Sequence, residues 1–291
     1  VGCAGGIDFS ASFQYKEEAV PAGMAAFRLA IKGLKGGHSG MDINLGRGNS
    51  NKLLFRFLKT YAKELGLRIA NILGGSLRNA IPRESFATVV LPAENAEKLQ
   101  TAVKEAEAIF QAELSAKEPT LSVSAEATEM PSFIIDSCSQ FRITNAILAC
   151  PNGPVRMIDS MPGTVETSNN LAIVQSKDGK IIVKSLLRSS VETAKDALAQ
   201  SIRAVFELAE ADEINFEGGY PGWKPNPDSA ILNEMQEIYE KMYGTRPAIM
   251  AIHAGLECGI LGSKYPNWDM ISFGPTLCSP HSPDERVNIP S

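Results

Sequence analysis

Residues 49–66 read NSNKLLFRFLKTYAKELG and form the most regular segment of this chain. The large apolar side chains recur at helical spacing, at Leu53, Leu54, Phe57, Leu58, Tyr61 and Leu65. This spacing puts them on one face of a helix, and Gly66 is a typical residue just past a helix end. The segment therefore predicts an amphipathic helix over 49–65.

Strands and a second helix are predicted around this segment. The strands fit at 24–33, 67–73, 85–91 and 120–127, and a charged helix fits at 93–115. The resulting order, βαββαβ, is that of a ferredoxin-like unit. A second series follows, with helices at 138–149 and 190–209 and strands at 165–175, 180–187 and 213–217. The two series share an element order, but no residue-level similarity establishes a repeat.

The composition changes at 218–228, GGYPGWKPNPD, which is typical of a crossover between domains. Beyond it we expect a helix at 227–243, a strand at 249–252, a short helix and a strand at 268–273. This final third reads as layers of α/β structure with few strands of its own. It is therefore expected to complete a sheet that other polypeptide provides.

Bulk composition limits the class of protein. The 291 residues are 44% hydrophobic and 21% charged, as in soluble globular proteins of about two domains. A net charge of -5 disfavours nucleic acid as a partner, and no apolar run approaches the ~20 residues of a membrane helix. The five cysteines form no C-x-x-C pair, and no signal peptide is expected, so a reducing cytoplasm is predicted. The start at Val1 without a methionine and the stop at Ser291, straight after a loop, suggest a fragment.

Three histidines, His38, His253 and His281, lie in loops rich in glycine or serine. His281, in SPHSPDER, has two prolines that stiffen its loop and an acidic pair that could orient a zinc-binding imidazole, or it is a surface histidine. His38, in GGHSGMD, could donate to a developing oxyanion, or it is a turn residue. No role is assigned to His253.

Two charged residues are further candidates. Glu257, in HAGLECG, could bind a substrate amine, or it is a glutamate favoured by the dipole at a helix start. Arg188 ends a predicted strand and could grip a carboxylate through two parallel hydrogen bonds, or it forms a surface salt bridge. Nucleotide-binding loops and a serine nucleophile elbow are absent from the sequence.

Six motifs together resemble one family. They are GGHSGMDINLGRGN, VETSNNLA, SLLRSS, GYPGWKPN, HAGLECG and SPHSPDERV, and the opening GCAGGID is similar as well. This set resembles the aminoacyl-histidine dipeptidases, also called Xaa-His or cytosolic non-specific dipeptidases. They belong to a dizinc superfamily that includes the carnosinases, peptidase T and carboxypeptidase G. The resemblance covers essentially the whole chain.

The resemblance implies a two-domain architecture, with a ferredoxin-like α+β lid inserted in an α/β catalytic domain that is incomplete in this chain. The lid would span 25–213, with 1–24 and 214–291 as parts of the catalytic domain. The lid often forms the dimer, so a homodimer is expected, without nucleic acid or membrane. Two zinc ions are implied, and cobalt or manganese could replace them.

The same resemblance implies site residues. His281 matches a zinc ligand, His38 the lid histidine that reaches toward the oxyanion, and Arg188 the lid arginine that grips the substrate carboxylate. Asn169 or Asn170 is expected to assist at the substrate, and Glu257 lies in a loop near the substrate's amino end.

The chain also departs from the family pattern. The other metal ligands and the general-base glutamate belong upstream of GCAGGID and are not in this sequence. We therefore expect the intact enzyme to hydrolyse dipeptides and this chain alone to be inactive. A non-catalytic lid and dimerisation module, or a related amidohydrolase acting on N-acyl amino acids, remain as alternatives.

Overall fold

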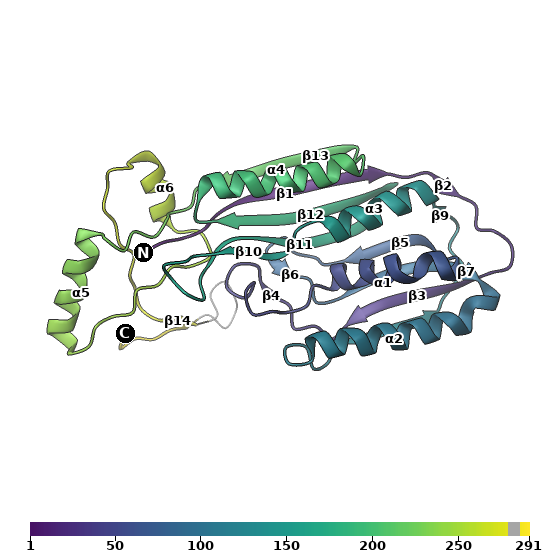
Figure 1. Cartoon of the computed structure of the whole chain (residues 1–291), viewed down its shortest axis with the longest axis horizontal. Coiled ribbons are helices and arrows are strands. Elements are labelled where there is room, and N and C mark those ends of the chain that lie inside the picture. The colour runs from purple at the N-terminus through teal and green to yellow at the C-terminus, as the bar shows by residue number, and fades with distance from the viewer. Residues whose placement is uncertain (279–285) are drawn as a thin grey trace.

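The computed structural model describes residues 1–278 and 286–291. Its main feature is a nine-stranded antiparallel sheet, of which eight strands form the path β13-β1-β12-β11-β5-β7-β3-β8 and β10 (Gly153–Met157) pairs with β11. The helices Ser50–Leu65, Ala96–Leu114, Ser137–Ala149 and Glu192–Leu208 lie along one face of this sheet (Figure 1). Among the described residues, the opposite face has no such helical layer.

One half of the sheet is the ferredoxin-like unit expected from the sequence, which is thereby confirmed. Its strands stand in the order β8-β3-β7-β5, so that the first and third strands of the unit are central. Asn49 caps the first helix by accepting from the Lys52 amide, and Gly66 ends it with a φ of 64°. The elements are β3 (Met24–Lys32), α1 (Ser50–Leu65), β5 (Arg68–Gly74), β7 (Ser85–Pro92), η1 (Ala93–Asn95), α2 (Ala96–Leu114) and β8 (Ser122–Ala127).

The other half repeats this topology, with its first strand supplied from before the inserted unit. In the order β13-β1-β12-β11, the first strand of this half, β1, and its third strand, β12, again lie at the centre. The elements are β1 (Gly5–Gln14), α3 (Ser137–Ala149), β11 (Val165–Lys177), β12 (Lys180–Ser189), α4 (Glu192–Leu208) and β13 (Glu213–Tyr220). The halves join where β11 pairs with β5. The predicted domain boundaries at 24/25 and 213/214 stay a prediction, and the sheet runs across both of them.

The core lies between the sheet and its helices. Phe9 of β1 packs against Phe206 of α4, with ring centroids 4.8 Å apart, and against Phe216 of β13 at 5.2 Å. Large side chains of α1, including Phe55 and Phe57, are almost completely buried against the sheet. Burial of this apolar surface is the main stabilising contribution, and it holds the strand ends that carry the site in fixed register.

Short strands extend from the sheet and shape the site. β4 (Gly37–His38) pairs with β6 (Ala80–Ile81), and β2 (Glu17–Glu18) pairs with β9 (Ile134–Ile135). The first pair brings the loop with His38 beside the turn before β7. The second pair ties the point where the chain leaves β1 to the point where it returns toward α3.

The C-terminal segment lies beyond one end of the sheet and has few elements of its own (Figure 1). They are α5 (Ala230–Tyr243), α6 (Glu257–Lys264), β14 (Leu277–Cys278) and β15 (Arg286–Val287). The strand expected at 268–273 is not formed, and 249–252 contributes a single parallel bridge between Ile252 and Cys3. The expectation at 268–273 was wrong because a strand needs a neighbouring strand, which this run does not have among the described residues. The run 249–252 does lie beside the start of the chain, since the Ile252 amide donates to Gly2 O over 3.0 Å and the Ile252 carbonyl oxygen accepts from the Ala4 amide over 3.1 Å.

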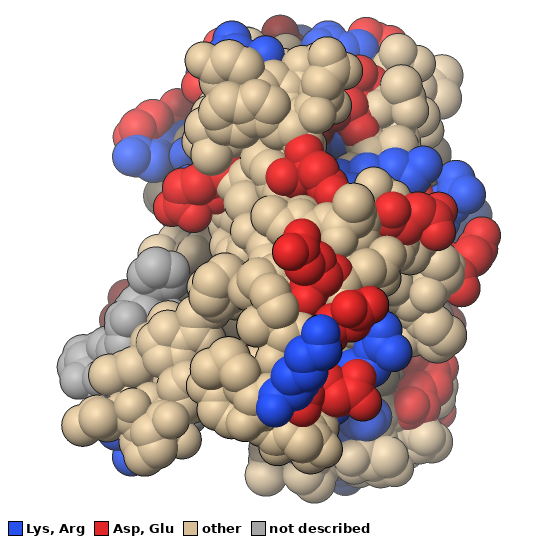
Figure 2. Space-filling view, turned by 90° about the vertical axis from the view of Figure 1, so that its left-hand side faces the viewer, with Lys and Arg blue, Asp and Glu red and all other residues tan. Residues whose placement is uncertain are grey.

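Apolar side chains of this segment face solvent. Phe273 is 81% exposed and Met250 72% exposed. Much of the surface at this end of the molecule carries no charged side chain (Figure 2). Within the described part, no helix is long and apolar enough to cross a bilayer.

Candidate functional site

His38 is held by its own loop. Its backbone N–H donates to Asp42 Oδ2 over 2.8 Å, and its ring Nδ1 accepts from the amides of Gly40 at 3.1 Å and Met41 at 3.2 Å. A nitrogen that accepts hydrogen bonds carries no proton, so the neutral ring has its proton on Nε2. The loop therefore selects the tautomer in which Nε2 is the donor.

Arg188 lies at the end of β12 and is only 5% exposed. Its Nε donates to Ser39 Oγ over 3.3 Å, and its Nη1 donates to the Tyr220 hydroxyl over 3.0 Å. Ser39 follows His38 in the chain, so the structure brings these two predicted residues together. Burial lowers the pKa of Arg188 from its ordinary value, but that value is so high that the guanidinium stays charged.

The charge of Arg188 has no acidic partner in the part of the chain that the structure describes. The ion pairs of that part do not include Arg188, and its two hydrogen bonds are to neutral hydroxyl groups. Its Nη2 makes no hydrogen bond to a described residue. A charged group that is nearly buried is costly unless it is paired, so this guanidinium is suited to receive an anion.

His253 is the main residue at this site to which the sequence assigned no role. It is 7% exposed, and its Nε2 lies 2.7 Å from Ser168 Oγ on β11. Burial, with a further contribution from the nearby Arg188 charge, lowers the pKa of His253 to about 3. The ring is therefore neutral at physiological pH. Its place in the loop motif HAGLECG was the available signal, but nothing in the sequence links it to Ser168.

Asn169 and Asn170 point to opposite faces of β11, as neighbouring strand residues do. Asn170 donates to the carbonyl oxygens of Arg78 at 3.2 Å and Ala80 at 2.8 Å, which secures the β6 strand that pairs with His38. Asn169 donates to Pro151 O over 2.7 Å, on the helix-covered side. Both side chains thus have structural hydrogen bonds, and their action on a substrate stays a prediction.

The last two predicted residues are not joined to this cluster. Glu257 is exposed at the first position of α6, and no described hydrogen bond or ion pair links it to His38 or Arg188. His281 lies outside the described residues. Within those residues, no group of three His, Cys, Asp or Glu side chains is placed to hold a metal ion. The described residues therefore do not fit a metal centre by themselves.

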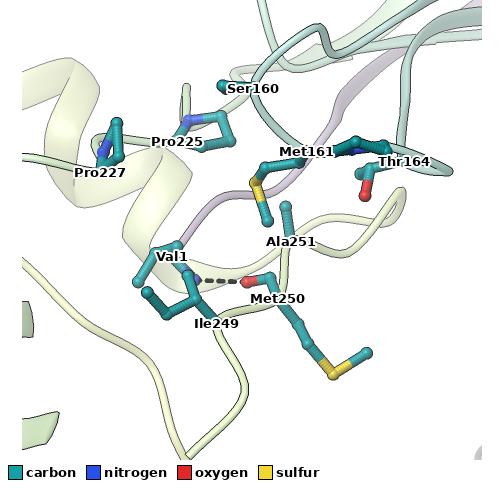
Figure 3. Close-up of a pocket in the computed structure, with 10 residues that line it drawn as sticks. Val1, Ser160, Met161, Thr164, Pro225, Pro227, Ile249, Met250 and Ala251 are labelled. Atoms are coloured by element: carbon teal, nitrogen blue, oxygen red, sulfur yellow. Dashed lines mark hydrogen bonds between the residues drawn. The ribbon is translucent and has the colours of Figure 1, made fainter.

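Two pockets lie near the site. The larger, of about 470 Å³, lies between the loop with Met161 and the segment 249–251, next to Pro225 (Figure 3). None of the predicted site residues lines it. The smaller, of about 260 Å³, is lined by charged side chains that include Asp8 and Arg78, which form an ion pair at 2.7 Å. Arg188 itself does not line this pocket.

Comparison with known proteins gives consistent results. Residues 29–118 match a peptidase dimerisation domain. The chain is 42% identical over all 291 residues to the cytosol non-specific dipeptidase of Escherichia coli, of which it covers 60%. It superposes on the crystal structure of aminoacylhistidine dipeptidase from Vibrio alginolyticus with a TM-score of 0.94 and 47% identity. That match covers 98% of this chain and 58% of the other.

Both matches extend over essentially the whole chain, at 42% and 47% sequence identity. The match to the dimerisation domain begins within β3 and ends just after α2, so it covers most of the inserted ferredoxin-like unit but not β8. The chain spans less than two thirds of the length of either relative. Over the part that it spans, the chain is thus similar to the cytosol non-specific dipeptidase of Escherichia coli and to the aminoacylhistidine dipeptidase of Vibrio alginolyticus.

Proposed function

We propose that the intact protein hydrolyses dipeptides and that this chain supplies the groups that bind the substrate's carboxylate and stabilise the oxyanion. One observation carries the proposal: Arg188 is 5% exposed and, among the described residues, has no carboxylate partner. A free dipeptide ends in a carboxylate, whose two oxygens match the fork of a guanidinium. Binding it would supply the ion-pair partner that Arg188 lacks among the described residues.

His38 has the second role in this proposal. The tautomer fixed by its loop makes Nε2 a hydrogen-bond donor in the neutral ring, which is what a negative oxygen formed during peptide hydrolysis requires. The adjoining Ser39 holds Arg188, so the two binding groups are coupled through neighbouring residues. Glu257 is proposed to meet the substrate amine, with Asn169 or Asn170 assisting at the substrate.

Metal ions belong to the same proposal. The family is metal-dependent, and we propose two zinc ions in the intact protein, with His281 as one ligand and cobalt or manganese as possible replacements. The described residues form no metal site alone, so this chain by itself is proposed to be inactive. Metal analysis of the intact gene product and of the 291-residue chain tests both statements.

The remaining parts of the proposal concern assembly and location. We propose a homodimer through the lid at 25–213, which the matching dimerisation domain supports, and a catalytic domain that includes 1–24 and 214–291. Exposed apolar side chains such as Phe273 support additional polypeptide packing on the C-terminal segment. The name of the relative from Escherichia coli supports a cytoplasmic location. Sedimentation of the intact gene product measures the assembly.

The test is a comparison of Arg188→Lys with wild type in the intact gene product. Lysine keeps the charge but not the fork, so the KM for a dipeptide should rise about thirtyfold, from the loss of roughly 2 kcal/mol. A dipeptide with an amidated C-terminus should bind weakly and equally to both proteins. Arg56→Lys, in an exposed ion pair with Glu113 on α1 and α2, is the matched control. An unchanged KM in the Arg188→Lys variant would contradict the proposal.

The amidohydrolase alternative is separated by the other end of the substrate. N-acyl amino acids share the carboxylate but lack the free amine, so the Arg188 observation fits them equally. A panel of dipeptides and their N-acetyl forms on the intact protein decides between these classes. If neither class is hydrolysed by metal-loaded protein, the non-catalytic dimerisation module is the remaining function.

A further inference from the structure

Tyr220, Gly6 and Arg188 form one row across three neighbouring strands. Gly6 of β1 is opposite Arg188 of β12 on one side and opposite Tyr220 of β13 on the other. Adjacent strands lie about 4.8 Å apart, so the two outer backbones are separated by about 10 Å. A tyrosine can span this distance only if the middle position leaves room above the sheet.

Gly6 leaves that room. A Cβ atom at Gly6 would lie 2.5 Å from the Tyr220 hydroxyl oxygen and 2.6 Å from its Cζ, closer than atoms can approach. The phenol ring therefore lies directly over Gly6. On its other side a Cβ at Gly255 would lie 3.0 Å from Cε2 of the same ring. Tyr220 is thus held between two glycines that come from opposite ends of the chain.

The position of the ring orients the guanidinium. The Tyr220 hydroxyl accepts from Nη1 of Arg188 over 3.0 Å, while Ser39 accepts from Nε over 3.3 Å. Two contacts at different nitrogens fix the rotation of the guanidinium plane. Both acceptors are neutral, so they orient the charge without compensating it.

We propose that Tyr220 is a positioning residue that aims Arg188 at the substrate carboxylate, and that Gly6 is required because it lets the phenol cross to β12. This inference rests on the proposed function of Arg188. It gives a physical role to residues from GCAGGID and GYPGW, two motifs that the proposed function leaves unexplained.

The surroundings of Arg188 support this arrangement. His253 is close enough that the Arg188 charge contributes to the low pKa of its imidazole, about 3, of which burial is the larger cause. The imidazole is therefore neutral and adds no competing positive charge. Hydroxyl groups orient the guanidinium, a neutral ring lies near it, and no described carboxylate forms an ion pair with it.

The test uses steady-state kinetics of the intact gene product. Tyr220→Phe removes the hydroxyl and keeps the ring, so the KM for a dipeptide should rise about tenfold with kcat changed less than twofold. Inhibition by the C-terminally amidated dipeptide should be unchanged. Gly6→Ala should reproduce the rise in KM by displacing the phenol, and Tyr220→Phe with Gly6→Ala together should be no worse than the more impaired single variant.

Two controls match these changes. Gly219→Ala adds a methyl group beside Tyr220 but meets only Ile7 at an ordinary 3.7 Å, and Tyr239→Phe removes a hydroxyl from exposed α5. Neither should change the KM. Melting temperatures identify a variant that fails to fold, in which case Tyr220→Phe alone decides the matter.

The outcomes separate this inference from the proposed function. If Arg188→Lys raises the KM and Tyr220→Phe leaves it unchanged, Tyr220 does not position the guanidinium and the inference is wrong. If Arg188→Lys also has no effect, the proposed function fails and the inference fails with it. Multiplicative effects of Tyr220→Phe and Gly6→Ala would contradict the role assigned to Gly6.

Discussion

Replacing Glu118 by alanine is expected to destabilise the loop that carries His38. Glu118 is fully buried, and its carboxylate accepts two backbone N–H groups, from Lys35 at 2.7 Å and from Gly48 at 2.9 Å. These two residues flank the loop between β3 and α1. The carboxylate therefore fastens both ends of the loop to the connection between α2 and β8.

The size of the effect follows from those two bonds. A hydrogen bond to a charged group contributes about 1.5–3 kcal/mol, so losing both should cost about 3 kcal/mol or more. For a chain of this size that corresponds to a melting temperature lower by about 6–10 °C. The amides of Lys35 and Gly48 should also exchange hydrogen faster, because they lose their acceptor.

Chemical denaturation gives the stability change, and hydrogen exchange locates it. Glu234→Ala, on the exposed side of α5, is the control and should change stability by less than about 0.5 kcal/mol. If Glu118→Ala changes stability as little as the control does, and the amides of Lys35 and Gly48 stay protected from hydrogen exchange, the carboxylate does not fasten the loop and the reasoning is wrong.

Three other predictions concern stability. Folding lowers the pKa of His253 from 6.5 to about 3, so on acidification the unfolded state binds a proton that the folded state does not. The free energy of unfolding, measured by urea denaturation, should therefore fall by about 1.4 kcal/mol per pH unit below about pH 6. His253→Gln should abolish this contribution. Lys52→Met should cost about 2–4 kcal/mol in the same assay, because the ammonium group donates to three carbonyl oxygens at the end of α3. Gly33→Ala should cost more than about 3 kcal/mol, because its Cβ would lie 1.8 Å from Thr120 O; Gly23→Ala, with the same φ of 78° but open space, should cost about 1 kcal/mol.

The sequence was sufficient to predict elements whose pattern is local. The helix expected at 49–65 is α1 at Ser50–Leu65, and the strand expected at 85–91 is β7 at Ser85–Pro92. Both are long enough for their apolar period to be distinct, and their ends carry capping residues or turns. The ferredoxin-like order followed from these elements.

The sequence could not predict which strands pair when they are far apart along the chain. The family resemblance assigned residues 1–24 to the catalytic part, and the sequence alone gave no partner strands for them; the structure places β1 between β12 and β13. Strand periodicity says which residues share a face, but not which strand is the neighbour. The apolar run at 268–273 failed for a related reason, since no described strand lies beside it.

In the candidate site, too, residues within recognisable motifs were predicted, whereas their contacts with distant residues were not. Arg188 and His38 were selected from their motifs, and the structure places Ser39, the neighbour of His38, against the guanidinium. Tyr220 and His253 were missed as partners because their contacts with Arg188 and Ser168 depend on chain segments that meet only in the folded molecule. A tyrosine that reaches across a glycine leaves no signature in spacing alone.

The insertion of one unit between β1 and its partner strands has a consequence for biosynthesis. The β2–β9 pair closes the inserted unit at its base, so a ribosome completes that unit while its strands are all close in sequence. β1 is made before every other strand of the sheet, yet its partner β12 ends at Ser189. Its apolar residues Phe9 and Phe13 therefore have no β12 partner until that strand has been synthesised. A nascent chain arrested before β12 should bind chaperones through this strand.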